Sequence, residues 1–160
     1  MNIRKVQETD VDNIFNLTEQ FATSFKTDYA LFKISFNSLT QEPSAHFLLA
    51  EENEKIIAYC LGFDHYTLYA NGKVAWLEEI FVLEDHRRHG VARLLMSEFE
   101  NWARFRNSKL IGLATRRARD FYTSIGYEDS AIFLENYFRK SENKNSASRL
   151  TSDLRICFIT

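Results

Sequence analysis

A basic run with a single glycine lies near the middle of the chain and has the composition of an anion-binding loop. Arg87-Arg88-His89-Gly90-Val91-Ala92-Arg93 places three arginines around Gly90. Guanidinium groups suit phosphates, because they are planar, permanently charged and rich in hydrogen-bond donors. Glycine lets the main chain approach a ligand closely. The run therefore predicts a site for a ligand that carries phosphate groups.

The stretches on either side of this loop are of the types that position such a site. Residues 74–82 are apolar and rich in β-branched and aromatic side chains, which predicts a strand. After the loop, apolar residues recur at the three- and four-residue spacing of an amphipathic helix: Val91, Leu94, Leu95, Phe99 and Trp102. The first-turn N–H groups and the positive end of the helix dipole attract anions. The sequence thus predicts a phosphate-binding strand, loop and helix.

Two motifs in this region resemble those of a known family. Val82-x-x-x-x-Arg87-x-x-Gly90-x-Ala92 resembles the signature of the GNAT superfamily of acetyl-CoA-dependent N-acetyltransferases, whose loop reads Gln/Arg-x-x-Gly-x-Gly/Ala. The stretch 118–127 is similar to the later family motif Ala-x-x-Phe-Tyr-x-x-x-Gly-Phe/Tyr. The resemblance spans roughly residues 1–140 and is strong from 74 to 127. Glu84 and Thr115 depart from it, because many members have proline and asparagine there.

The resemblance implies which residues contact acetyl-CoA. The loop would hold the pyrophosphate, mostly through backbone N–H groups, with the residues Arg87, Arg88, His89, Gly90, Val91, Ala92 and Arg93. Ile80 and Val82 would offer main-chain groups to the pantetheine arm, as an added strand does. The Val82 N–H would also polarise the thioester carbonyl. Thr115, at the asparagine position of the family, is expected to contact the cofactor.

Acetyl transfer from a thioester to an amine needs a base for the amine and a proton for the leaving thiolate. The resemblance assigns the proton donor to Tyr122, which otherwise reads as a core tyrosine on the apolar face of a short helix. Glu78 is expected to be the base, directly or through water, and Glu79 a substrate-recognition carboxylate. Adjacent strand residues face opposite sides, and Glu78 has the parity of Ile80. Alternatively, Glu79 or both carboxylates only solvate an exposed strand end.

Other site types lack their defining residues. His86 and His89 form a His-x-x-His pair, but no cluster of Cys or His supplies further ligands, so no metal is expected. The chain has no Gly-x-Gly-x-x-Gly and no Gly-Lys-Ser/Thr, the motifs of dinucleotide and P-loop sites. It also has no Gly-x-Ser-x-Gly nucleophile elbow.

Composition narrows the class of protein further. The 160 residues are 45% apolar with a net charge of −2, which suits one domain with a substantial core and gives no basic field for nucleic acid. The start lacks a secretory segment and no apolar run reaches transmembrane length, so a cytoplasmic enzyme without a membrane partner is expected. Cys60 and Cys157 do not build a disulfide framework.

Periodicity and turn signals predict an α+β fold. Strands are expected at 3–6, 46–50, 55–63, 64–70, 73–83, 109–114 and 131–138. Helices are expected at 11–25, capped by Thr9 or Asp10, and at 28–39, 91–106 and 118–125. Asn71-Gly72 predicts a two-residue hairpin turn. A right-handed crossover makes strands 73–83 and 109–114 parallel. The result is a mixed, mostly antiparallel central sheet with helices on both faces (α/β/α), and the resemblance implies that its parallel strand pair is splayed.

The chain divides at about residue 140. Residues 1–140 are expected to form a GNAT-like N-acetyltransferase domain, and residues 141–160 a polar linker or C-terminal tail that ends in a short apolar segment, Ile156 to Ile159. That segment could add an edge strand, contact a second subunit or have no role. A homodimer is therefore a possible assembly.

These observations together favour an N-acetyltransferase that moves the acetyl group of acetyl-CoA to a primary amine by direct attack in a ternary complex. Glu78, Glu79 and Asp85 favour a small cationic amine through charge complementarity. One alternative is a catalytically silent acyl-CoA-binding regulator. Another is a protein acetyltransferase that modifies lysines or N-termini. A different acyl donor, such as succinyl-CoA, also fits the loop.

Overall fold

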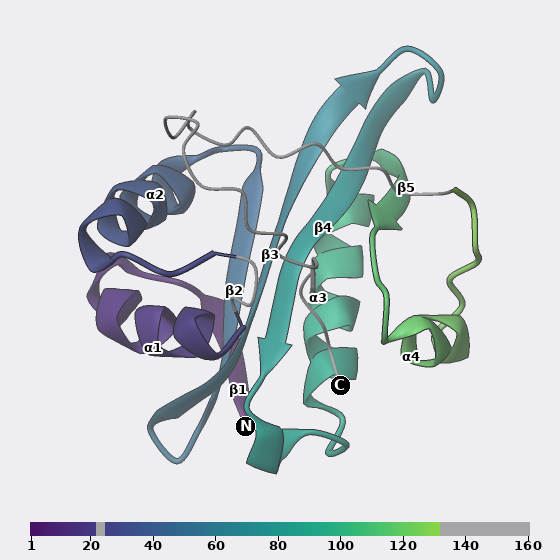
Figure 1. Cartoon of the computed structure of the whole chain (residues 1–160). Helices are drawn as coiled ribbons and strands as arrows, with labels where there is room; N and C mark the ends of the chain where they lie inside the picture. Colours follow the sequence, from purple (N-terminus) through teal and green to yellow (C-terminus); the bar gives the residue numbers. More distant parts are fainter. Residues whose placement is uncertain (22–24, 132–160) are drawn as a thin grey trace, which may run out of the picture.

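A mixed five-stranded sheet forms the centre of the molecule (Figure 1). The computed structural model describes residues 1–21 and 25–131, and in this part of the chain the strand order is β1-β2-β3-β4-β5. The strands are β1 (Asn2–Lys5), β2 (Ala45–Glu52), β3 (Lys55–Thr67), β4 (Gly72–Val82) and β5 (Ser108–Leu113). All neighbours are antiparallel except β4 and β5, which are parallel. The predicted α+β class and mixed sheet are confirmed.

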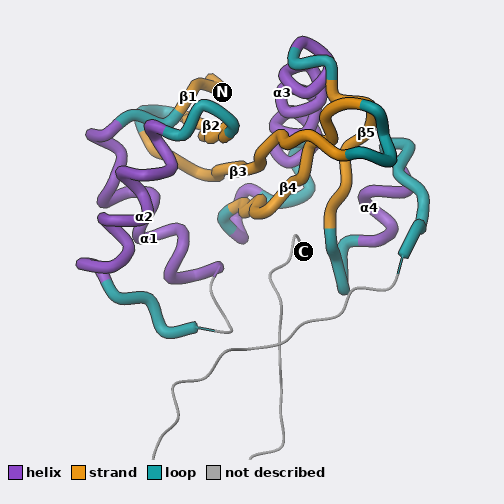
Figure 2. Tube along the Cα trace, turned by 90° about the horizontal axis from the view of Figure 1, so that it is seen from above, coloured by secondary structure: helices purple, strands orange, loops and turns teal. Residues whose placement is uncertain are grey.

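Helices cover both faces of this sheet, as predicted (Figures 1 and 2). On one face lie α1 (Val11–Phe21) and α2 (Tyr29–Gln41), and on the other lie α3 (Val91–Phe105) and α4 (Arg119–Ser124). Two short 3₁₀ helices, η1 (Glu8–Asp10) and η2 (Glu84–His86), precede α1 and the α3 loop. The buried side chains accordingly form two clusters, one on each side of the sheet.

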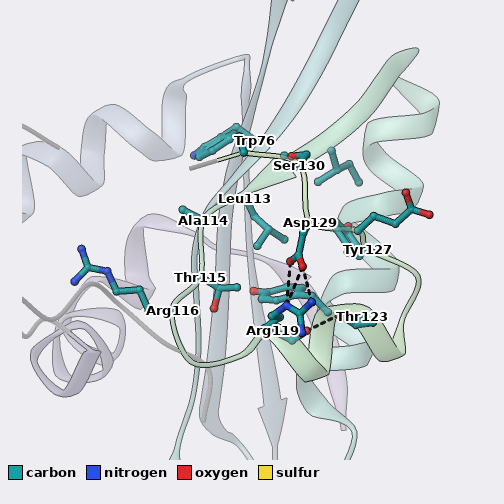
Figure 3. A pocket seen from close by; sticks show the side chains of 15 residues that line it. Trp76, Leu113, Ala114, Thr115, Arg116, Arg119, Thr123, Tyr127, Asp129 and Ser130 are labelled. Carbon is teal, nitrogen blue, oxygen red and sulfur yellow. Dashed lines mark hydrogen bonds and ion pairs between the residues drawn. The ribbon is translucent and has the colours of Figure 1, made fainter. Parts of the chain in front are cut away.

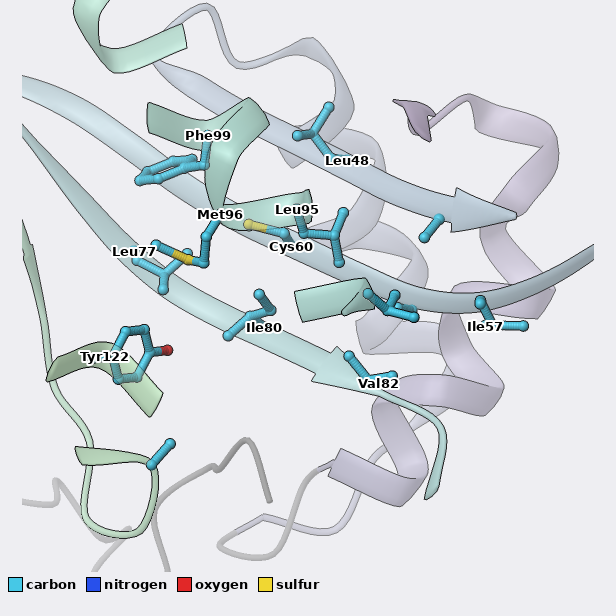
Figure 4. Close-up of a cluster of buried hydrophobic side chains, with 14 of the residues drawn as sticks. Leu48, Ile57, Cys60, Leu77, Ile80, Val82, Leu95, Met96, Phe99 and Tyr122 are labelled. Carbon is cyan, nitrogen blue, oxygen red and sulfur yellow. The ribbon is translucent and has the colours of Figure 1, made fainter. Parts of the chain in front are cut away.

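The amphipathic pattern of α3 explains its place on the sheet. Its buried residues follow the three- and four-residue spacing of one helical face: Val91, Leu95, Met96, Phe99 and Ala103. They pack against inward-facing residues of β2, β3 and β4 (Figure 4). Phe99 lies so close to Gly62 that a Cβ there would be 2.4 Å from its ring. This close contact fixes α3 against the middle of β3.

Three local predictions were wrong. The Asp10 carboxylate was expected to accept hydrogen bonds from the first-turn N–H groups of α1. It instead accepts the Gln7 N–H at 2.8 Å and pairs with Arg4 at 2.7 Å. Phe21 is the last described residue of α1, and Phe25, which was expected on its buried face, is exposed and lies outside the helix. The β3–β4 hairpin has a four-residue loop, 68–71, because Thr67 pairs with Gly72. The predicted strand 131–138 and the tail 141–160 lie outside the described residues apart from residue 131.

Two irregularities in β4 create the space for a site. The parallel pairing with β5 runs from Lys73 and Ser108 to Leu77 and Leu113 and stops there. In the pairing with β3, Gly62 faces Leu77 while Leu61 faces Glu79, so Glu78 is an extra residue in a β-bulge. The bulge and the end of the β5 pairing coincide. The second half of β4 therefore continues without β5 beside it.

Candidate active site

The loop before α3 has the backbone of an anion cradle. Arg88 and Gly90 both have left-handed conformations, with φ of 62° and 83°. Gly90 is the N-cap of α3, so no side chain caps the first-turn N–H groups, which have no acceptor within the helix. A Cβ at Gly90 would meet nothing within 4 Å, so the space above these amides is open. The predicted strand–loop–helix arrangement is confirmed.

A cavity of about 420 Å³ opens at this end of α3, and we call it the loop cavity. Its lining is Val82, His86, Arg87, Arg88, Gly90, Val91, Ala92, Arg93, Arg117, Ala118 and Phe121. Most of the residues expected to hold pyrophosphate are among them, whereas His89 is exposed and outside the lining. Arg117 and Phe121 were not predicted as site residues. The sequence signals for them were the arginines at 116, 117 and 119 and the motif 118–127, which contains Phe121.

The Arg87 side chain is engaged in holding the end of β4. Its Nε donates to the Val82 carbonyl at 3.0 Å, and its guanidinium carbon lies 5.8 Å from the centre of the Phe81 ring. The guanidinium therefore has a structural use in addition to its place in the loop cavity.

The backbone groups expected to bind pantetheine point to the open edge of β4. The Leu83 N–H donates to the Ile57 carbonyl of β3 at 2.9 Å. In an antiparallel ladder, alternate residues direct both backbone groups to the same neighbour. Ile80 and Val82 are out of phase with Leu83, so their N–H groups point away from β3, where β5 no longer pairs.

A small cavity, the junction cavity, lies where β4 and β5 part. It measures about 20 Å³, enough for one water molecule. Its lining comes from α1, β4, α4 and the loop that follows β5: Phe21, Leu77, Glu78, Ile80, Ala114, Thr115 and Tyr122. The predicted acid and the predicted base, Tyr122 and Glu78, thus border the same space.

Tyr122 is buried, and its hydroxyl points toward β4 (Figure 4). Burial raises the pKa of this hydroxyl above its ordinary value, so it keeps its proton at neutral pH. No hydrogen bond to the hydroxyl is formed within residues 1–21 and 25–131. The Tyr122 hydroxyl is therefore a protonated donor available to a ligand in the junction cavity.

The two adjacent glutamates of β4 differ in their surroundings. Glu78, in the bulge, is exposed, whereas Glu79 is half-buried and accepts a hydrogen bond from the Tyr59 hydroxyl at 2.8 Å. The pKa of Glu79 is raised above its ordinary value. Burial is the largest cause and the charge of Glu78 adds to it, while the Tyr59 hydrogen bond acts in the opposite direction. The pair is thus one solvated carboxylate and one anchored carboxylate.

Thr115 stabilises the entry to α4. Its hydroxyl accepts the Ala118 N–H at 3.1 Å. Thr115 and Tyr122 also line a cavity of about 380 Å³ between β5, α4 and residues 127–131 (Figure 3). At its rim, Arg119 forms an ion pair with Asp129. Thr115 therefore positions the segment that carries Tyr122, and it borders the junction cavity itself.

Neither a metal site nor a membrane span is evident in the part of the chain that is described. No group of three His, Cys, Asp or Glu side chains there could hold a metal ion. The imidazole of His86 lies 3.9 Å from the Glu52 carboxylate, whereas His89 is exposed. No helix within residues 1–21 and 25–131 is long and apolar enough to cross a membrane.

Known proteins are similar to this chain over most of its length. The model of the acetyltransferase (GNAT) family matches residues 10–127. The uncharacterized N-acetyltransferase YhfO of Bacillus subtilis (strain 168) is 24% identical over 140 residues, 84% of this chain and 94% of YhfO.

Solved structures share the fold. A transcriptional regulator from Bacillus halodurans C-125 superposes with a TM-score of 0.80 at 19% identity, over 86% of this chain and 99% of the other. The aminoglycoside antibiotic 6'-N-acetyltransferase AAC(6')-IG of Acinetobacter haemolyticus superposes with a TM-score of 0.74 at 23% identity, over 89% and 100%.

Proposed function

The chain belongs to the GNAT acetyltransferase family, and from this premise we propose that it transfers the acetyl group of acetyl-CoA to a small cationic primary amine in the cytoplasm. The observation that carries the proposal is the free edge of β4. Val82 lines the loop cavity and Ile80 lines the junction cavity, so this edge connects the predicted pyrophosphate site with the predicted acid and base.

Each part of the donor has a matching group along this path. The open first-turn amides of α3 and the arginines around Gly90 suit the pyrophosphate. The outward N–H groups of Ile80 and Val82 suit the pantetheine arm, which would extend along the open edge as a strand does. Bound acetyl-CoA supplies an activated acyl carbon at the end of that arm. The Val82 N–H would then polarise the thioester carbonyl.

The transfer step assigns a role to three side chains. The amine nitrogen bonds to the acyl carbon as the carbon–sulfur bond breaks. Glu78 accepts the proton that the amine loses, directly or through a water in the junction cavity, and Tyr122 gives a proton to the leaving thiolate. Glu79 binds the cationic form of the acceptor before transfer, and this ammonium group releases one proton to solvent so that its nitrogen is neutral when it attacks.

Direct attack in a ternary complex is favoured by the surroundings of Cys60. This thiol is fully buried among the residues packed on α3. Burial raises the pKa of the thiol, which keeps it protonated and poorly nucleophilic. Cys60 is thus unsuited to carry an acetyl group, and the amine itself is the nucleophile.

A cationic acceptor is favoured by the carboxylates of β4 and η2, of which Glu78 lines the junction cavity. Glu78 and Asp85 are exposed, and Glu79 adds an anchored carboxylate. Such an arrangement attracts an ammonium group and repels an anionic substrate. The acetyltransferase AAC(6')-IG, which has the same fold, acts by its name on the 6'-nitrogen of an aminoglycoside antibiotic, which agrees with an amine acceptor.

The proposal is tested by thermal shift with acetyl-CoA, followed by thiol release across a panel of primary amines. At about 100 times its dissociation constant, a ligand of the native state adds roughly 2.7 kcal/mol of stability, a rise of several degrees in Tm. A shift with turnover of small cationic amines is the expected result. A shift without turnover on any small amine favours the silent regulator or a protein substrate, and acetylation of peptides separates these two. No shift at saturating acetyl-CoA would refute the assignment of the loop.

A further inference from the structure

Tyr59 of β3 reaches across to Glu79 of β4. Its hydroxyl donates to Glu79 Oε2 at 2.8 Å. In the strand register Tyr59 faces Phe81 and Leu61 faces Glu79, so Tyr59 and Glu79 are diagonal neighbours on the same face of the sheet. A tyrosine is long enough to span that diagonal. The contact is therefore built by the register of the two strands.

Aromatic rings hold Tyr59 in place. Its ring centre lies 5.9 Å from that of Phe21, 6.1 Å from Phe47 and 6.3 Å from Phe81. Tyr59 is only 1% exposed, so its side chain has little freedom to move. A hydroxyl in such surroundings is costly without a hydrogen-bond partner, and Glu79 provides one. The hydroxyl position is thus fixed by packing, and it fixes the carboxylate in turn.

The bulge at Glu78 decides which carboxylate is anchored. Beyond the bulge, Glu79 lies on the face of α1 with Phe81 and Tyr59, while Leu77 and Ile80 both lie on the face of α3. Glu78 stays exposed and borders the junction cavity. Glu79 therefore stands on the sheet face opposite α3, and its position is set by a side chain with no part in the acid–base chemistry proposed above.

We propose that Tyr59 is a positioning residue for the acceptor amine: it holds the Glu79 carboxylate fixed and ionised so that this carboxylate binds the ammonium group of the substrate. The proposal rests on the function proposed above and adds a residue that neither motif contains. It also predicts a division of labour, in which Glu79 acts in binding and Glu78 in proton removal.

The hydrogen bond has a defined effect on the ionisation of Glu79. Among the described residues, the titratable groups that act on it are Tyr59 on β3 and Glu78 beside it, and α1 presents Phe21, which does not titrate. Burial and Glu78 raise the pKa of Glu79, and Tyr59 opposes them. Removal of the hydroxyl should therefore raise the pKa of Glu79 further, so that this carboxylate ionises at a higher pH than in the wild type.

The test is the Tyr59→Phe variant, which removes the hydroxyl and keeps the ring. The pH dependence of kcat/KM for the amine reports groups of the free enzyme, so its acid limb should contain a contribution of Glu79 beside that of the proposed base Glu78. In Tyr59→Phe this limb should move to higher pH by about one unit, the size expected for a lost hydrogen bond to a carboxylate. At a pH just above the midpoint of the wild-type acid limb, Tyr59→Phe should have a higher KM for the amine than the wild type and an unchanged kcat.

Two further variants make the result specific. Glu79→Gln should remove the contribution of Glu79 to the acid limb and leave that of the base Glu78, and adding Tyr59→Phe to it should change KM no further. Tyr127→Phe makes the same chemical change at a half-buried tyrosine that donates to Glu100 at 3.3 Å, and should leave the limb at its wild-type pH. If Tyr59→Phe only lowers Tm and the limb does not move, Tyr59 serves packing alone and the proposal is overturned.

Failure of this proposal is distinguishable from failure of the proposed function. If the wild-type protein acetylates an amine and only the Tyr59→Phe limb is unmoved, the positioning role alone is wrong. If the wild-type protein acetylates no amine, the proposed function is wrong. In that case the ¹³C chemical shift of the Glu79 carboxyl group, followed through a pH titration, still decides the role of Tyr59. An unchanged midpoint in Tyr59→Phe overturns it.

Discussion

The Asp64 carboxylate of β3 accepts two hydrogen bonds from the Arg106 guanidinium at the end of α3, one on each oxygen and both at 2.8 Å. Lys73 of β4 adds a third contact at 2.9 Å. The Asp64 side chain is 1% exposed, so this charge is held inside the protein by its two cations. The group joins the β3–β4 hairpin to α3, the helix whose first turn forms the loop cavity.

Loss of the Asp64 charge should destabilise the fold strongly. Asp64→Asn leaves two cations without their buried partner, a change that costs about 3–5 kcal/mol in comparable buried pairs. Arg106 is partly exposed, so we expect the lower end of this range. Arg104→Gln is the matched control, because it breaks an exposed pair with Glu100 and should cost no more than about 0.5 kcal/mol. Urea unfolding of both variants measures the difference, and equal losses would contradict the buried role of Asp64.

His46 should make the folded state sensitive to acid. Its ring stacks on Trp102 with centres 4.7 Å apart, and its Nδ1 has no hydrogen-bond partner in the part of the chain that is described. Burial lowers the pKa of His46 to about 4, whereas in the unfolded chain it stays near 6.5. Between these values only the unfolded state binds the proton, so stability falls as the pH drops from about 6.5 toward 4. Above about 6.5 the contribution is constant.

The His46→Phe variant isolates this effect. It keeps the stacked ring and removes both the titration and the unpaired nitrogen. Between pH 7 and pH 4, its free energy of unfolding should fall less than that of the wild type. The two decreases should differ by at most about 3 kcal/mol. His65→Gln, at an exposed histidine, should leave the wild-type pH dependence intact. An identical acid response in His46→Phe and wild type would show that His46 does not titrate as described.

Two glycines with similar backbones separate ligand binding from backbone strain. Gly90 and Gly126 have φ of 83° and 97°, and a Cβ at either would meet nothing within 4 Å. Alanine at each should cost about 1–2 kcal/mol of stability through the left-handed conformation. Only Gly90→Ala places a methyl group at the open amides of the loop cavity, so only this variant should lose about tenfold in CoA affinity. Calorimetry with CoA checks this, and equal affinities in the two variants would argue against the cradle.

The segment from β4 to α4 could be predicted from sequence because each element has a local signal. The apolar strand, the glycine loop and the amphipathic helix are each recognisable within a few residues, and the crossover rule then fixes β5 as parallel to β4. By the same reasoning the residues of the loop cavity were largely found in advance. Their assigned roles, like those of Tyr122 and Glu78, stay predictions.

The features that depend on pairing between distant strands could not be predicted. Strict alternation would put Leu77 and Ile80 on opposite faces of the sheet, whereas both lie on the face of α3. Because Glu78 and Glu79 are the same amino acid, the sequence does not show which of them is the inserted residue. Only the register with β3 reveals the bulge and thus which carboxylate meets Tyr59, a partner 20 residues away. The Asp64–Arg106 contact spans 42 residues for the same reason. Long-range register, which local patterns do not encode, decides these contacts.

The Tyr122 hydroxyl should matter for the transfer step and little for folding. The hydroxyl is protonated, lacks a partner within the described residues and points toward the open edge of β4. As the donor of a proton to the leaving thiolate, it should contribute at least about 100-fold to kcat. Tyr122→Phe should therefore lose this factor while its CoA affinity and Tm stay close to wild type.

A neighbouring tyrosine and a change of leaving group test this role. The Tyr127 ring lies 5.7 Å from that of Tyr122, and Tyr127→Phe removes the same atom from a half-buried residue, so its kcat should be unchanged. A thioester whose thiol is more acidic needs less help from a proton donor, and with it the loss in Tyr122→Phe should shrink. A loss of the same size with both donors would mean that the hydroxyl positions the ligand and does not protonate the thiolate. Full activity of Tyr122→Phe would remove it from the mechanism.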